Sequence, residues 1–222
     1  MKKFTSVVLI AALTTTLAAS LTACGSTQNQ SQQSSQAEAA QQTSVTQYPV
    51  TITTYDASGR EITQTFDKAP ERIVTNNLSA TETLIELGLG DKIVGMMNPD
   101  NTITSKYKDS IEKINKLGDK KSISKEVILS AAPDIVVGRA AMFSEKSLGA
   151  YTDWNNNGIN VYAQGASVTT GNVELTSVIQ DVKNLGIIFN VQDKANAYAD
   201  ELQKKYDAAV AKAGSSSSDK KN

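Results

Sequence analysis

Side chains that could carry out covalent chemistry are scarce in this sequence of 222 residues. Histidine is absent, and the single cysteine is Cys24. Without histidine the chain cannot build a Ser-His or Cys-His nucleophilic dyad, and it lacks the ligand that zinc sites commonly use. The Gly88-x-Gly90 pair would follow a helix and precede a strand, which is the reverse of the order in a dinucleotide site. The residues therefore favour binding over catalysis, and we expect no catalytic residue, metal site or cofactor.

Side chains suited to holding a ligand stand where four short apolar runs end. The runs cover residues 72–75, 93–96, 134–137 and 159–162 and are expected to be strands. Carboxamides both donate and accept hydrogen bonds, and a guanidinium group can meet two oxygens at once. The candidates for ligand contact are Asn76, Asn77, Met97, Asn98, Arg139 and Gln164.

Each of these candidates also has a plainer interpretation. Arg139 could bind an anionic ligand through paired hydrogen bonds, or it could close a loop in solvent. Met97 could line a cleft, although methionine at a strand end more often fills space in a core. Loop asparagines frequently support only a turn.

The elements that would position these residues alternate between strand and helix. This alternation predicts an α/β fold, a three-layer α/β/α lobe with a mostly parallel sheet. Ligands bind such sheets at the carboxyl ends of the strands, which is where the candidates lie. The helices are expected after a Ser79–Glu82 capping box, near 105–116, after a Ser124 cap, over 144–157 and over 173–189. An opening β-hairpin is expected from 48–54 and 61–66.

A long helix is predicted at the C-terminal end, over residues 191–213. Its apolar positions recur at steps of three and four, and about 20 residues make a rod roughly 30 Å long. Gly214 stands where a C-terminal cap would be, so 214–222 is expected to be a flexible tail.

The N-terminal segment is predicted to export and anchor the chain. Lys2 and Lys3 precede a short apolar run, which together predict a signal peptide over 1–23. The sequence around Cys24 resembles a bacterial lipobox, which implies a lipidated cysteine at the extracytoplasmic face of the cell membrane. An ordinary export signal with a stray cysteine is the alternative. Residues 24–47 are too polar to bury a core and are expected to be a disordered tether.

The charge balance disfavours a nucleic-acid partner. After removal of Lys2 and Lys3, 20 basic residues remain against 23 acidic ones, a net charge of −3. Nucleic-acid-binding domains are usually strongly basic.

Several segments together resemble the iron-siderophore and cobalamin substrate-binding lipoproteins of ABC importers, which are class III periplasmic binding proteins. The resemblance covers roughly Ile73 to Ala213, in order and spacing. The segments that carry it are Pro70–Val74, Ser79-x-x-Glu82, Leu87–Gly95, Ala132–Val137 and Gly158–Val161.

The resemblance implies two α/β lobes joined by one long helix. Residues 48–190 would be the N-terminal ligand-binding lobe and 191–213 the connecting helix. The second lobe would begin within a few residues of Asn222, so the sequence is either a fragment or a free-standing half. We expect a fragment, because the connecting helix would otherwise expose an apolar face. One lobe alone is expected to bind weakly.

The resemblance also implies a monomeric receptor that delivers a ferric siderophore to an ABC permease and its ATPase, without catalysis. Glu126 matches an acidic residue of the family that faces arginines on the permease. Its plainer interpretation is a carboxylate favoured near a helix N-terminus by about 0.3–1 kcal/mol.

Three alternatives to a siderophore receptor stay open. A cobalamin or haem receptor of the same family would have the same fold. A surface-anchored enzyme is possible on such a lobe, since fold alone does not decide function. A structural or interaction module would bind a partner and no small ligand.

Overall fold

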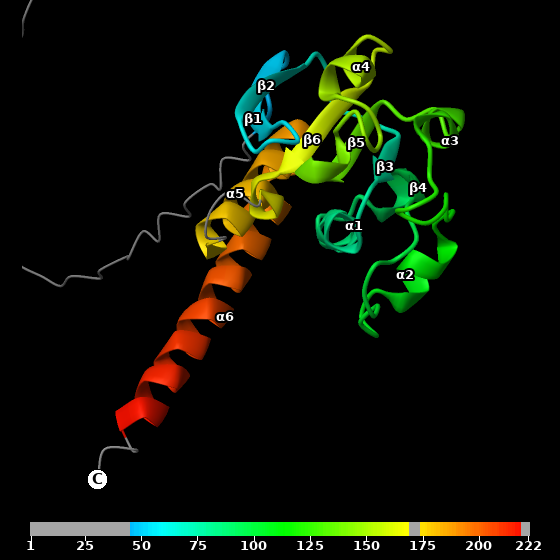
Figure 1. Ribbon diagram of the computed structural model, residues 1–222. Helices are drawn as coiled ribbons and strands as arrows, with labels where there is room; N and C mark the ends of the chain where they lie inside the picture. The colour runs from blue at the N-terminus through cyan, green and yellow to red at the C-terminus, as the bar shows by residue number, and fades with distance from the viewer. Residues whose placement is uncertain (1–44, 169–173, 219–222) are drawn as a thin grey trace, which may run out of the picture. The chain divides into compact units, whose positions relative to one another are not determined.

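Four short parallel strands form the central sheet of the protein (Figure 1). The structure is a computed structural model that describes residues 45–168 and 174–218, with the side chains of 214–218 left out. The described residues belong to one compact unit that begins at Gln41. The predicted signal peptide, Cys24 and most of the predicted tether lie outside them.

The elements follow one another in the alternation predicted from the sequence. The strands are β1 (Val50–Tyr55), β2 (Glu61–Phe66), β3 (Ile73–Thr75), β4 (Ile93–Met96), β5 (Ile135–Arg139) and β6 (Asn160–Gln164). The α-helices are α1 (Leu78–Glu86), α2 (Lys108–Lys113), α3 (Lys125–Ser130), α4 (Tyr151–Asn155), α5 (Leu175–Ile188) and α6 (Gln192–Ser218). Short 3-10 helices are η1 (Gly90–Lys92), η2 (Ala140–Met142) and η3 (Gly165–Ser167).

The sheet has the order β4-β3-β5-β6, with every pair parallel. The chain passes from β3 to β4 on one side and reaches β5 on the other, so the strand order reverses beside β3. β5 and β6 run further than the sequence predicted. Arg139 and Gln164 are therefore the last residues of their strands and not the first residues of loops.

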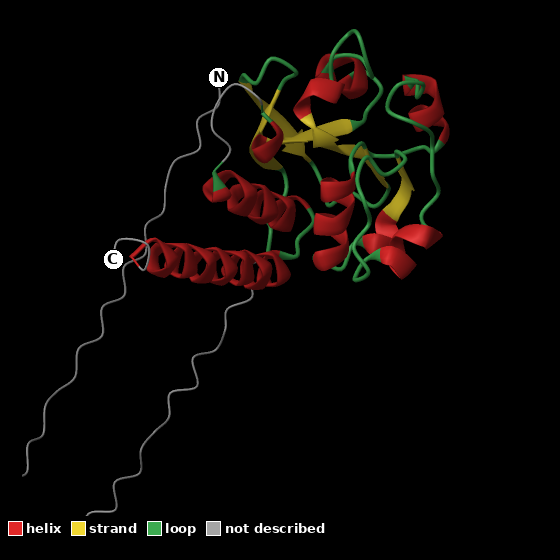
Figure 2. Ribbon diagram, turned by 60° about the horizontal axis from the view of Figure 1, so that its bottom comes forward, coloured by secondary structure: helices red, strands yellow, loops and turns green. Residues whose placement is uncertain are grey.

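Both faces of the sheet are covered, which confirms the three-layer prediction (Figure 2). Alternate residues of each strand enter different clusters because neighbouring side chains of a strand point to opposite faces. One cluster joins Ile73, Ile135, Val137 and Tyr162 to apolar side chains of α1 and α5. The other joins Val74, Val136, Val161 and Ala163 to those of α3 and α4.

The predicted β-hairpin, β1 with β2, covers the open edge of β6. The Thr54 hydroxyl donates to the Ala163 carbonyl (2.9 Å) and accepts from its N–H (2.8 Å). The Gln64 carboxamide oxygen accepts from the N–H of Val161 (3.2 Å). Side chains thus satisfy backbone groups that an edge strand would otherwise leave open.

Two helix predictions were wrong. The Ser79–Glu82 capping box is not formed, since α1 already begins at Leu78 after Asn77, and Ser79 accepts a hydrogen bond from the Asn77 side chain (2.8 Å). The helix predicted over 144–157 is restricted to α4. Gly149, with φ +86°, interrupts it before that point.

Two other helix ends follow the prediction, whereas the predicted end of the last helix was wrong. The Ser124 side chain accepts from the N–H of Val127 (3.4 Å) and caps α3 as expected. Gly88, with φ +73°, ends α1. The last helix continues past Gly214, the predicted cap, to Ser218, because glycine in a helix interior costs only about 1 kcal/mol and does not force a stop.

Helix α6 packs on the rest of the lobe only along its first part. Ala195 and Ala199 are buried, and Gly186 of α5 lies so close to Ala195 that a side chain there would collide with it. From Gln203 to Ala213 every side chain is exposed, including Tyr206 and Val210. Among the described helices, α6 included, none combines the length and apolar character that a membrane span requires.

The hairpin turn between β1 and β2 is organised by the buried carboxylate of Asp56. Its Oδ1 accepts from the Ser58 N–H (2.8 Å) and hydroxyl (2.6 Å), and its Oδ2 accepts from Nε of Arg60 (2.9 Å). The bond from the Ser58 hydroxyl is the main cause that lowers the pKa of Asp56 to about 2. The turn is therefore built around an ionised side chain.

We expect this carboxylate to make the lobe acid-sensitive. Because the native donors hold its pKa below the value of about 3.9 in the unfolded chain, its contribution is present above pH 4 and is lost as pH falls through about 2. Asp56→Asn should lower the free energy of unfolding by about 1–3 kcal/mol at pH 7. Urea unfolding at pH 7, 4, 3 and 2 should show that the difference in unfolding free energy between the variant and the parent chain shrinks towards pH 2. A difference that stays constant with pH would contradict this role.

Candidate functional site

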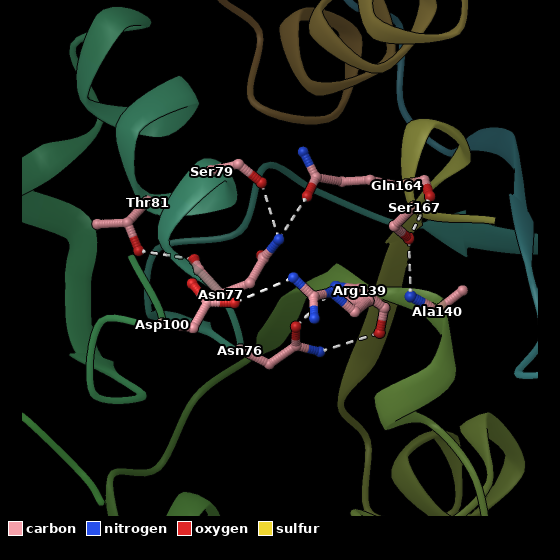
Figure 3. A network of polar contacts seen from close by, with 9 residues as sticks. All are labelled: Asn76, Asn77, Ser79, Thr81, Asp100, Arg139, Ala140, Gln164 and Ser167. Atoms are coloured by element: carbon pink, nitrogen blue, oxygen red, sulfur yellow. Dashed lines mark hydrogen bonds and ion pairs between the residues drawn. The ribbon is translucent and has the colours of Figure 1, made fainter. Parts of the chain in front are cut away.

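Asn76, directly after β3, fixes the end of β5 at the carboxyl edge of the sheet (Figure 3). Its Oδ1 accepts from the backbone N–H of Arg139 (2.6 Å), and its Nδ2 donates to the Arg139 carbonyl (3.3 Å). The side chain is 4% exposed. A single carboxamide therefore holds both backbone groups of Arg139 at the point where the strand order reverses.

Gly138 makes this arrangement possible. Its φ of +152° lies in the region that side chains disfavour, and a Cβ at this position would collide with Oδ1 of Asn76. The same Cβ would lie 2.8 Å from Oδ1 of Asn77. The close approach of the two asparagines to β5 thus requires glycine.

Asn77 joins the end of β3 to the end of β6. Its Nδ2 donates to the hydroxyl of Ser79 (2.8 Å) and to Oε1 of Gln164 (3.4 Å). Both Asn77 and Gln164 are 6% exposed. The Oδ1 of Asn77 is buried without a hydrogen-bond partner among the described residues, so it keeps an acceptor for a further donor.

The guanidinium group of Arg139 is already paired. Its Nη2 lies 3.0 Å from Oδ2 of Asp100, a residue of the loop after β4. The Arg139 side chain is 35% exposed and that of Asp100 27%. The ion pair therefore crosses the carboxyl end of β3 from one neighbouring strand to the other.

These residues border a cavity of about 300 Å³ between α1 and α5. This volume is at the lower end of the range of small-molecule sites. Half of its lining residues carry neutral hydrogen-bonding side chains, and three are apolar. The lining residues are Asn77, Ser79, Thr83, Arg139, Gln164, Ala166, Ser167, Val178, Asp181 and Val182.

Asp181 was not predicted from the sequence, although it organises one wall of the cavity. Its Oδ1 accepts from the Tyr162 hydroxyl and the Gly165 N–H (both 2.8 Å), and its Oδ2 accepts from the Ala166 N–H (2.9 Å). Burial raises the pKa of Asp181, and these donors act against the rise. The available signal was its place on the apolar face of α5, one residue before Val182.

The structure brings three of the six predicted ligand residues to the cavity, namely Asn77, Arg139 and Gln164. Asn76 lies beneath them as the support described above. Met97 is 1% exposed and packs in the core cluster of α3 and α4. The Asn98 side chain does not line the cavity, and its Nδ2 instead donates to Oδ1 of Asp119 (2.7 Å). The last two therefore lie apart from the cavity lining.

Glu126, predicted to meet the permease, is exposed in the first turn of α3. Its hydrogen bond with the Ser124 side chain is the main cause that lowers its pKa. Helix α3 returns the chain to the amino end of β5, so its first turn lies towards the carboxyl edge, the same edge as the cavity. No cluster of three or more acidic or cysteine side chains suited to a metal ion occurs in the described part of the chain.

The sequence and the fold of the chain both match known binding proteins. The sequence model of the family described as periplasmic binding protein matches residues 73–222. A curated relative is the uncharacterized ABC transporter substrate-binding lipoprotein YvrC of Bacillus subtilis strain 168, 35% identical over 124 residues. That match covers 56% of this chain and 34% of the relative.

Two solved structures share the fold at somewhat lower sequence identity. A periplasmic binding protein from Veillonella parvula DSM 2008 is 29% identical, with a TM-score of 0.68, over 77% of this chain and 54% of that one. An ABC-type Fe3+-hydroxamate transport system from Saccharomonospora viridis DSM 43017 is 27% identical, with a TM-score of 0.57, over 73% and 56%. The chain thus spans about half the length of these structures and about a third of the curated relative.

The contact between Gly138 and the asparagines yields a prediction. Gly138→Ala should destabilise the lobe by at least about 2 kcal/mol, because it combines a strained φ with a collision against buried side chains. Gly90→Ala is the matched control, since its Cβ would meet Ile85 at an ordinary 3.5 Å. Thermal unfolding by circular dichroism should show a clear loss for the first variant and nearly none for the second. Equal melting temperatures would mean that the close approach is not a constraint.

Proposed function

The chain belongs to the periplasmic binding protein family, and we propose that it is the ligand-binding lobe of a substrate-binding lipoprotein that serves an ABC importer. The observation that carries the proposal is the cavity at the carboxyl edge of the sheet, where Asn77, Arg139 and Gln164 converge. A lining that offers carboxamide, hydroxyl and guanidinium groups beside apolar side chains fits capture and release of a ligand. The family is one of binding proteins and not of enzymes.

The proposed ligand is an iron complex of the siderophore type. The Saccharomonospora viridis structure is described as an Fe3+-hydroxamate transport system, and this chain shares 27% of its residues over the matched region. Hydroxamate complexes present carbonyl and N–O oxygens, which the donors of Gln164 and Arg139 could meet. Haem and cobalamin are the competing ligands of the same proposal.

The proposed location is the extracytoplasmic face of the cell membrane, with Cys24 as the lipid-bearing residue. The curated relative is named as a lipoprotein, which agrees with the lipobox-like sequence around Cys24. A polar tether over 24–47 would let the lobe reach both ligand and permease while it stays anchored.

The proposed partners are an ABC permease and its ATPase, contacted in part through Glu126. Its exposure and its position towards the carboxyl edge would let a permease meet the same side of the lobe that holds the ligand. An exposed carboxylate adds selectivity and encounter rate more than raw affinity.

Ligand titration tests the binding role. The purified chain should bind a ferric trihydroxamate with a dissociation constant no tighter than about 10 µM, because one lobe encloses only part of a ligand. Gln164→Ala should weaken binding about fivefold through loss of a hydrogen bond. Gln203→Ala, a matched change on exposed α6, should leave it unaltered. Isothermal calorimetry with the trihydroxamate, haem and cyanocobalamin in parallel identifies the ligand, and no saturable binding of any of them would refute the proposal.

Uptake measurements test the docking role of Glu126. Glu126→Lys in the producing cells should lower uptake of ⁵⁵Fe-labelled complex at least about tenfold, since it places like charges opposite the permease arginines. Glu145→Lys is the control, an exposed charge reversal elsewhere on the lobe. Unchanged uptake by the Glu126 variant would leave only the plainer interpretation of a carboxylate at a helix N-terminus.

A further inference from the structure

The Arg139–Asp100 ion pair neutralises the one cationic side chain that lines the cavity in the described structure. From the sequence, Arg139 could have been an anchor for anionic ligands. In the structure Nη2 of Arg139 donates a hydrogen bond to Oδ2 of Asp100 (3.0 Å). An anionic ligand at the remaining N–H donors would therefore meet a guanidinium whose charge a carboxylate already balances.

The backbone is anchored at Arg139 on one side of the pair and two residues before Asp100 on the other. Asn76 binds the N–H and the carbonyl of Arg139. On the other side, the loop before Asp100 is fixed at Asn98, whose N–H donates to the Gly118 carbonyl (2.9 Å). Proline at position 99 further restricts that loop. The chain is thus restrained on both sides of the pair.

The remaining charge at the cavity is negative. Among the described lining residues, Asp181 is the other ionisable side chain, and both of its oxygens accept hydrogen bonds from backbone N–H groups, as a carboxylate does. Asp100 balances the single guanidinium and Asp181 adds a further negative charge, so an added anion meets a net negative charge at this cavity.

We infer that Asp100 is a specificity-determining residue that excludes anionic ligands from this cavity and leaves it selective for uncharged metal complexes, such as a neutral ferric trihydroxamate. The inference deepens and rests on the proposed function, because it names the class of complex that the receptor would accept. Selectivity of this kind comes from a repulsive group placed against the wrong ligand as much as from contacts to the right one.

A small anion tests the role of Asp100 without any iron complex. Inorganic phosphate is titrated against the ¹⁵N-labelled chain, and the Nε–H resonance of Arg139 is followed by NMR. Asp100→Asn should raise phosphate affinity at Arg139 about three- to tenfold at low ionic strength, and the gain should shrink as salt is added. Asp67→Asn, an exposed change of the same charge at the end of β2, should give no gain.

A second arm compares two ferric complexes of similar size, a neutral trihydroxamate and a trianionic tricatecholate. Asp100→Asn should raise the ratio of tricatecholate to trihydroxamate affinity by about the same factor, and the further change Arg139→Gln should abolish the gain. Phosphate affinity that is equal in the parent and the Asp100 variant, or a gain that persists without Arg139, overturns the inference. Failure of both iron complexes to bind, with the phosphate result as expected, would instead remove the proposed function.

Discussion

The candidate site depends on one constraint, the double hydrogen bond between the Asn76 carboxamide and the backbone of Arg139. β3 and β5 are neighbours in the sheet, yet beyond their ends the chain leaves in different directions. The buried Asn76 side chain bonds both the N–H and the carbonyl of Arg139. It thereby continues the hydrogen bonding between β3 and β5 beyond the end of β3. Gly138 must then lack a side chain, and the Arg139 guanidinium is directed towards Asp100. The shape of the cavity follows from this hydrogen bonding.

Most of the fold could be predicted because its signals are local. Apolar triplets such as Ile135–Val137 mark strands covered on both faces, and their alternation with helices fixes a parallel sheet. The wrong predictions occurred where tertiary contacts outweigh local pattern. Ser79 resembles an N-cap, yet it lies inside α1 because Asn77 is tied to Gln164 on β6 and sets where the helix begins. The sequence of α1 by itself gives no sign that Asn77 contacts Gln164.

The position of the candidate cavity could be predicted from the sequence, but the orientation of its side chains could not, for a related reason. The rule that ligands bind at the carboxyl ends of parallel strands selects four loops, and three of the selected side chains do reach the cavity. The direction in which a loop side chain points is set by partners elsewhere in the chain, as Asp119 sets it for Asn98. Asp100 and Asp181 were missed because their importance lies entirely in such partners. In the sequence each is simply a polar residue.

The charge arrangement bears on how tightly one lobe can hold a ligand. A cavity whose cation is already paired offers a ligand hydrogen bonds and shape, each worth little while water competes for the same groups. Such contacts gain strength when the ligand is enclosed and water is excluded. The chain spans about half the length of the solved structures it matches. Enclosure, and with it most of the affinity, would then have to come from the surface that closes over this edge, while the lobe itself determines which charge is admitted.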